Sequence, residues 1–280
     1  MIKEFAKKVD YPVPEILRDL VAGFILGETQ KPVNEIIPMY PSGYCLFFHT
    51  FGDKPFLSIN GQKQETPSRL IVAGQICDAK INFHINGIFG QIGAVLYPTA
   101  NYYLLHKTGD NFLNTWRNLK EASPLDTREL HQNLELEKCN QKCLLLLIEY
   151  LKLLEKQRLP PITWLDDSLF KIFLKNGNLS QQELIEDAMV SARHFRRIFK
   201  KVIGVSPKYY CKIIQLATVF HLLNTSEKEK LHHLALDCGY YDQSHFIRDF
   251  QKLIGKSPEN FLNGKHSYLK TYMGRRGVDS

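Results

Sequence analysis

The polar and basic side chains best suited to chemistry lie in two clusters in the C-terminal part of the chain. The first comprises Arg193, Arg196, Arg197 and Lys200, and the second comprises Gln243, Ser244 and Arg248. Intervals of three and four residues place such side chains on one side of a helix. Arginine can hydrogen-bond guanine at two atoms, glutamine can do the same to adenine, and basic groups also pair with phosphates. These residue types therefore predict contacts with a nucleic-acid duplex.

Both clusters belong to a segment that occurs twice in the chain. Residues 191–207 align without gaps with residues 242–258, an offset of 51 residues, and are identical at nine of 17 positions. Agreement at this level between two separate helices indicates an internal duplication. The identical pairs are His194/His245, Phe195/Phe246, Arg197/Arg248, Phe199/Phe250, Lys201/Lys252, Ile203/Ile254, Gly204/Gly255, Ser206/Ser257 and Pro207/Pro258.

Each copy predicts a short helix, a tight turn and a second helix. The short helices are expected at 181–188 and 230–237, and Ser180 with Glu183 has the pattern of a capping box. The second helices are expected to start after a capping Ser191 or Asp242 and to end at a glycine. The apolar residues of each second helix recur at helical spacing and predict a buried face. This arrangement is a helix-turn-helix, whose second helix enters a major groove about 12 Å wide.

The motif from Ala235 to Phe250, followed by Gly-Lys-Ser-Pro at 255–258, resembles the signature of the AraC/XylS transcription regulators. The first copy matches the same family from Leu179 to Tyr210. The resemblance covers about 163–262 and implies two helix-turn-helix units joined by a linker helix at about 208–223. It implies that two successive faces of the major groove are read. Carried over by position, the DNA-binding residues are Arg193, Arg196, Arg197, Lys200, Gln243, Ser244, His245 and Arg248.

The sequence departs from the family pattern in two places, the first turn and the expected linker helix. Met189 stands where the family has a turn glycine, so we expect strain or a different shape in the first turn. Ile213 and Gln215 of the expected linker helix stand where basic residues are common. Phosphate contacts from that helix are correspondingly in doubt.

The charge distribution agrees with a polyanionic partner at the C-terminal end. The chain has 280 residues and a net charge of +7. Residues 163–280 hold 18 Lys+Arg and 12 Asp+Glu, a balance of 18 − 12 = +6, whereas residues 1–162 hold 18 and 17. Charge alone leaves a solvated basic face as an equal alternative. No run of 18 apolar residues and no N-terminal signal pattern occurs, so we expect a cytoplasmic protein, no membrane partner and reduced thiols for the six cysteines.

The first 120 residues predict antiparallel β-structure. Short apolar runs recur about every ten residues from Tyr44 to Tyr97, and an Asn60-Gly61 pair predicts a hairpin turn. Pro41-Ser42-Gly43 and the segment 90–98 resemble a cupin-like sensing domain that occurs fused to this DNA-binding domain. Four aromatic or histidine side chains could line a ligand pocket or form the core of the β-barrel: Tyr40, Phe47, His49 and Tyr97.

Leucines at helical spacing predict a helical connector at about 126–158, which ends at Pro160-Pro161. Its leucine-rich face either forms a homodimer or packs on the β-barrel. The fold class expected is α+β multidomain: a cupin-like antiparallel β-barrel, the connector and an all-α double helix-turn-helix. The expected domains are 1–122 for sensing, 123–160 for the connector, 161–264 for DNA binding and 265–280 for a basic tail.

No catalytic residue, cofactor or metal site is predicted. His49, His84 and His106 lack the spacing of a cupin metal site, and Cys139 with Cys143 is expected to be a pair of buried thiols. The predicted function is a sequence-specific DNA-binding regulator, an activator by the resemblance, whose β-barrel holds an effector or partner. The expected partners are a double-stranded operator, a small-molecule effector of unknown identity, a second copy of the chain and RNA polymerase. The competing hypothesis is a β-barrel enzyme that the helix-turn-helix units target to DNA.

Overall fold

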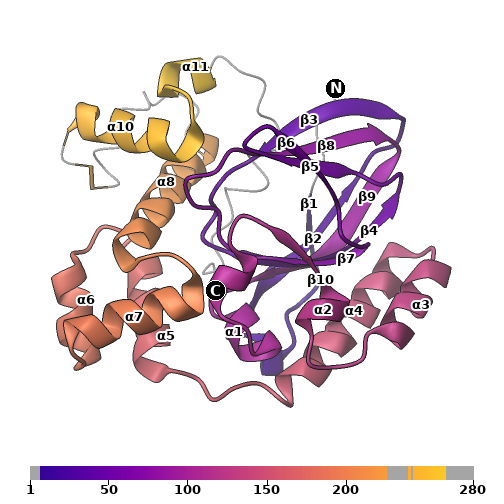
Figure 1. Cartoon of the computed structure of the whole chain (residues 1–280), viewed down its shortest axis with the longest axis horizontal. Coiled ribbons are helices and arrows are strands. Elements are labelled where there is room, and N and C mark those ends of the chain that lie inside the picture. Colours follow the sequence, from indigo (N-terminus) through magenta and orange to yellow (C-terminus); the bar gives the residue numbers. More distant parts are fainter. Residues whose placement is uncertain (1–6, 226–238, 241, 263–280) are drawn as a thin grey trace.

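The computed structural model describes residues 7–225, 239–240 and 242–262. Figure 1 shows a β-sandwich on one side of the molecule and helices on the other, with α3 and α4 against the sandwich. The fold class is α+β, with an N-terminal antiparallel part and an all-helical C-terminal part. The expected helix at 230–237 and the basic tail at 265–280 lie outside the described residues.

Two antiparallel sheets form the β-domain, the name used here for residues 7–118. One sheet has the strand order β1-β2-β9-β4-β7-β10 and the other has the order β3-β8-β5-β6. The strands are β1 (Lys7–Val9), β2 (Val21–Glu28), β3 (Val33–Met39), β4 (Cys45–Gly52), β5 (Phe56–Ile59), β6 (Gln62–Glu65), β7 (Leu70–Ala73), β8 (Ile81–Gly87), β9 (Phe89–Leu96) and β10 (Trp116–Asn118).

Local sequence chemistry explains the strand pairing. Asn60 and Gly61 both have positive φ, 50° and 85°, and join β5 to β6 in the predicted hairpin. The alternation of β8, buried at Ile81, Phe83 and Ile85, turns one face of its sheet toward the sandwich core. Four side chains were expected to line a ligand pocket or to form the barrel core. Two of them, Phe47 and His49, are buried within β4.

Short helices lie between the strands of the β-domain in chain order, and one more follows β10. They are η1 (Glu15–Leu17), α1 (Ala100–Leu105), η2 (Gly109–Phe112) and α2 (Leu119–Ala122). The connector consists of two helices, α3 (Arg128–Leu136) and α4 (Asn140–Glu155), rather than one. The Glu137 carboxylate accepts hydrogen bonds from the backbone N–H groups of Lys138 and Cys139, which stabilises the break.

The leucine-rich face of α4 packs on the β-domain. Leu144, Leu147, Ile148 and Leu151 are each 1% exposed and share one core with Phe47 of β4. Self-association through that face would require the core to open. Cys143 is buried, but Cys139 is exposed at the start of α4, so the expectation of two buried thiols is wrong for Cys139. Its position before the first turn, outside the apolar face, is the reason.

The C-terminal part consists of α5 (Thr163–Leu174), α6 (Gln181–Ala188), α7 (Ala192–Ile203), α8 (Pro207–Thr225), α10 (Gln243–Ile254) and α11 (Pro258–Leu262). Among the described residues, no helix is both long enough and apolar enough to cross a membrane.

Candidate nucleic-acid interface

The first helix-turn-helix unit is built from α6 and α7. The Ser180 hydroxyl accepts a hydrogen bond from the Glu183 backbone N–H, and the Glu183 carboxylate accepts one from the Ser180 backbone N–H, so the predicted capping box is present. Ser191 accepts from the backbone N–H of His194 at 3.2 Å and starts α7, and Gly204 ends it in the left-handed region. Both caps follow the sequence prediction.

Helix α7 separates an apolar face from a basic one. Phe195 and Phe199 are 0% exposed and pack within the core of this unit. The four predicted readers are all exposed: Arg193, Arg196, Arg197 and Lys200. Arg196 donates from Nε to Gln181 Oε1 at 3.1 Å, which ties its guanidinium to the N-terminal end of α6. The N-terminal half of α7 therefore presents basic donors to solvent.

Helix α10 repeats this design with fewer charges. Asp242 accepts from the backbone N–H of His245 at 2.7 Å and Gly255 ends the helix with φ 79°. Gln243, Ser244 and Arg248 are exposed, and Arg248 Nε donates to the Ser244 carbonyl at 3.2 Å. The two units thus differ in chemistry, with arginine-rich donors on α7 and a mixed amide, hydroxyl and guanidinium set on α10.

His245 is held inside its unit rather than turned outward with the other three. Its ring lies 5.4 Å from that of Tyr240, and its Nε2 lies 3.3 Å from Asp249 Oδ2. Asp249 is 7% exposed and also pairs with Lys212 of α8, at 2.6 Å. This chain of three polar groups ties α10 to the linker helix. The first unit has Ile198 at the position of Asp249, so the network belongs to the second unit alone.

Helix α8 lies between the two units and belongs to both cores. Tyr210, Cys211 and Ile214 pack in the core of the first unit. Other α8 residues pack in the core of the second unit: Ile213, Leu216, Val219 and Phe220. Ile213 is 0% exposed, which explains why a basic residue is absent there. A helix buried on two sides fixes the orientation of one unit relative to the other.

Comparison with known proteins identifies this part of the chain. Residues 184–264 match a family model described as a helix-turn-helix domain. The HTH-type transcriptional activator RhaS of Escherichia fergusonii is 28% identical over 109 residues, and the invasion protein InvF of Salmonella typhimurium is 36% identical over 89 residues. Residues 184–264 are a helix-turn-helix domain.

These similarities do not extend over whole proteins. The matched segments cover 39% of this chain and 37% of RhaS, and 31% of this chain and 40% of InvF. Over the complete fold, ToxT of Vibrio cholerae superposes with a TM-score of 0.48 at 13% identity, covering 86% of this chain and 97% of ToxT.

The helix-turn-helix domain packs on the β-domain through its first unit. Tyr210 Oη donates to the Gly43 carbonyl at 2.8 Å, and Tyr209 Oη accepts from the Asp78 backbone N–H at 3.1 Å. Lys201 Nζ lies 5.8 Å from the centre of the Tyr102 ring. The C-terminal end of α7 therefore faces the β-domain while its arginine-rich half faces away.

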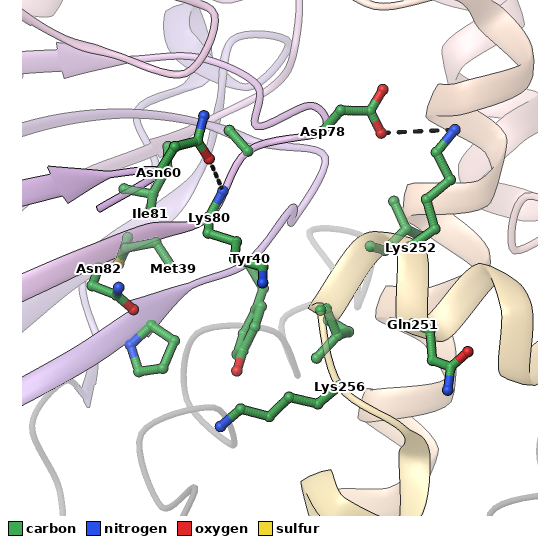
Figure 2. A pocket seen from close by; sticks show the side chains of 15 residues that line it. Met39, Tyr40, Asn60, Asp78, Lys80, Ile81, Asn82, Gln251, Lys252 and Lys256 are labelled. Carbon is green, nitrogen blue, oxygen red and sulfur yellow. Dashed lines mark hydrogen bonds and ion pairs between the residues drawn. The ribbon is translucent and has the colours of Figure 1, made fainter. Parts of the chain in front are cut away.

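The second unit meets the β-domain across a groove of about 660 Å³ (Figure 2). Figure 2 shows lysines entering from both sides, Lys80 from the β-domain and Lys252 and Lys256 from the end of α10 and beyond. Lys252 Nζ lies 3.7 Å from Asp78 Oδ1. Tyr40 lines the groove and packs edge-on against Phe261. Lys252 therefore contributes to the contact between the two domains.

Sequence reasoning missed the residues that join the units and the domains. Tyr209, Tyr210 and Lys212 occur in the linker helix without a spacing that distinguishes them. Asp249 carried a usable signal, because an acid occurs where the first copy has a core isoleucine.

Met189 provides a test of the predicted strain. It ends α6 with φ 51° and ψ 34°, and its side chain is 91% exposed. The left-handed region costs a residue with a Cβ roughly 1–2 kcal/mol. We expect Met189→Gly to raise the free energy of unfolding by about 1 kcal/mol, as measured by denaturant titration. Met189→Ala keeps the Cβ and is the control; an equal gain in both variants would contradict the strain argument.

Proposed function

We propose that this protein is a transcription regulator that binds a DNA operator through α7 and α10, under the control of its β-domain. One observation carries the proposal: two capped helices expose polar N-terminal halves, and a single linker helix buried in both units sets their spacing. A recognition helix contacts bases through its N-terminal residues. A rigid pair of such helices would read two neighbouring groove segments.

The test starts from an operator selected out of random duplexes by the full-length protein. We expect Arg196→Ala and Gln243→Ala each to weaken operator binding by about 1–3 kcal/mol and to relax base preference, because each removes a bidentate donor. Titration at fixed salt measures the affinity of each variant for the operator and for its single-base substitutions.

Lys156→Ala is the matched control for the loss of charge, since Lys156 is exposed at the end of α4. It should leave binding unchanged. Wild-type affinity in both Arg196→Ala and Gln243→Ala would overturn the placement of these helices in the groove.

Control by an effector or partner is supported by the contacts of the β-domain with both units. Tyr210 joins it to the first unit and Lys252 joins it to the second. A ligand that changes the β-domain would therefore act on both recognition helices. Comparison of operator affinity between the full chain and an Asp78→Ala variant, which loses the Lys252 contact, would measure this coupling.

RNA polymerase and a second copy of the chain complete the proposed partners. RhaS is described as a transcriptional activator, which supports an activator role for this chain. In vitro transcription from the selected operator would show it as increased transcript. Because the leucine-rich face of α4 is buried, a homodimer would use other groups such as Leu145 and Leu153, which are 38% and 50% exposed. Light scattering of the full chain measures its mass.

The enzyme hypothesis required a metal triad or an activated cysteine. Burial raises the pKa of Cys45 and of Cys211 to about 12, opposite to the lowered pKa of a nucleophilic thiol. Among the residues that the structure describes, no three His, Cys, Asp or Glu side chains gather where they could hold a metal. Metal analysis of the purified protein would distinguish a catalyst from a regulator.

A further inference from the structure

A second pocket lies between the β-domain and α5 and shares no lining residue with the lysine-lined groove. Its volume is about 340 Å³, within the range of small-molecule sites. The geometry points to a binding site for a small organic cation with an aromatic or aliphatic body, such as a protonated amine. The residues that carry the argument are Asp166, Tyr97, Tyr103, Phe170 and Phe173.

Asp166 supplies the charge that such a cation would pair with. It lies in the first turn of α5, half-buried, and its Oδ2 accepts a hydrogen bond from Tyr103 Oη at 2.9 Å. Within the described ranges, no Lys, Arg or His forms an ion pair with this carboxylate. A partly buried charge without an oppositely charged partner is costly, so an incoming cation gains from compensating it.

Of the two arginines near the pocket, Arg158 is held by other carboxylates and Arg18 is largely exposed to solvent. Arg158 NH1 lies 2.5 Å from Asp19 Oδ2 and its Nε lies 3.8 Å from Glu155. Arg18, on the rim, lies 4.0 Å from Glu15. The lining therefore keeps a net negative charge, centred on Asp166.

Burial, together with the smaller effects of the neighbouring carboxylates of Asp19 and Asp167, raises the pKa of Asp166 to about 6. The hydroxyls of Tyr103 and Thr99 act in the opposite direction by hydrogen bonding to the charged form. Above pH 6 the site therefore holds an ionised carboxylate, and below pH 6 it becomes neutral. Perturbed acids in pockets of this kind mark functional sites more often than exposed ones do.

Aromatic rings form the rest of the wall. The Phe173 ring packs edge-on to Tyr97 at 6.2 Å and stacks on Tyr44 at 5.6 Å. Phe170 is 56% exposed on the next turn of α5, an exposure that the core does not explain. Rings beside a carboxylate attract a cation by its charge and bury its apolar body. An organic anion would be repelled by the Asp166 carboxylate, and a neutral ligand would leave the charge of that carboxylate uncompensated.

The raised pKa of Asp166 makes the stability of the fold depend on pH. Because the pKa of Asp166 is raised on folding, its protonated form contributes stability that is fully present below about pH 4 and is lost as the pH rises through 6. The isosteric Asp166→Asn keeps an acceptor for Tyr103 and removes the charge. It should raise Tm by about 2–4 °C at pH 7.5 and by less at pH 5.

The binding test uses the full-length protein and three probes of the same shape: 2-phenylethylamine, 3-phenylpropionate and 2-phenylethanol. Calorimetric titration at pH 7.5 should show saturable binding of the amine that weakens about tenfold at pH 5 and in Asp166→Asn. The control Asp167→Asn removes the same charge from the neighbouring, exposed position on α5 and should bind the amine as the wild type does.

Three results would overturn the site: no amine binding by the wild type at pH 7.5, equal binding by Asp166→Asn, or tighter binding of the anion or the alcohol than of the amine. The measurement needs no DNA, so its result does not depend on whether the proposed regulator function is correct. If both hold, the ligand would sit where α5 of the DNA-binding part meets the β-domain.

Discussion

Replacement of Gly109 by alanine is expected to separate the β-domain from the first helix-turn-helix unit. Gly109 begins η2 and lies against the last residues of α7. A Cβ at this position would collide with the backbone nitrogen of Gly204 and the backbone carbonyl carbon of Ile203. Backbone atoms cannot rotate away as a side chain can. We therefore expect a cost at or above the upper end of overpacking, about 3 kcal/mol.

The collision is confined to the contact between domains, so the two parts should lose their mutual packing while each keeps its own core. Thermal unfolding should change from one transition to two, and small-angle scattering should show a larger radius of gyration. Lys107→Ala, at a half-buried position two residues away, is the control. A single transition at the wild-type Tm with unchanged scattering would show that Gly109 does not hold the domains together.

Replacement of Phe250 by alanine is expected to cost about 3–5 kcal/mol and to disorder α10 selectively. Phe250 is 0% exposed and meets three other rings, at 5.7 Å for Phe220, 5.4 Å for Phe246 and 5.3 Å for Phe261. These rings belong to the core of the second unit. The first unit has a separate core. Tyr102 and Leu113 of the β-domain are partly buried and pack against it.

Hydrogen exchange would locate the loss: protection should fall in α10 and α11 and remain in α7. Operator binding should weaken to that of a single unit. Phe250→Leu retains most of the apolar volume and should cost about 1 kcal/mol, with α10 still protected. Uniform loss of protection across both units in Phe250→Ala would instead mean that the two cores unfold together.

Recognition elements of this protein follow from short-range rules. Ser180, Ser191 and Asp242 occupy cap positions because their side-chain oxygens satisfy free backbone N–H groups within three residues. The Asn60-Gly61 turn joins its strands because both residues tolerate positive φ. Interactions of this range depend on neighbours in the chain, so the residue pattern determines them.

The connector has two features that short-range rules do not predict, its division into α3 and α4 and the partner of its leucine-rich face. Leucine spacing from 130 to 154 predicts helix, but it carries no information about the side chain of Glu137, which breaks the helix by bonding the backbone ahead of α4. Nor does it say what covers the leucine-rich face. The β-domain does, and that outcome depends on residues about 100 positions away.

The sequence by itself determined the duplicated unit, its caps, its buried phenylalanines and the polar residues that lie on the exposed side of α7 and α10. Only the tertiary structure decided that Ile213 belongs to a core, that Lys252 pairs with Asp78 and that Asp166 lies beside Tyr103 and Phe173. The physical reason is that burial and pairing depend on which distant segments come together. Gly109 and Gly204 lie 95 residues apart in the chain, and only their contact in space makes a missing Cβ matter.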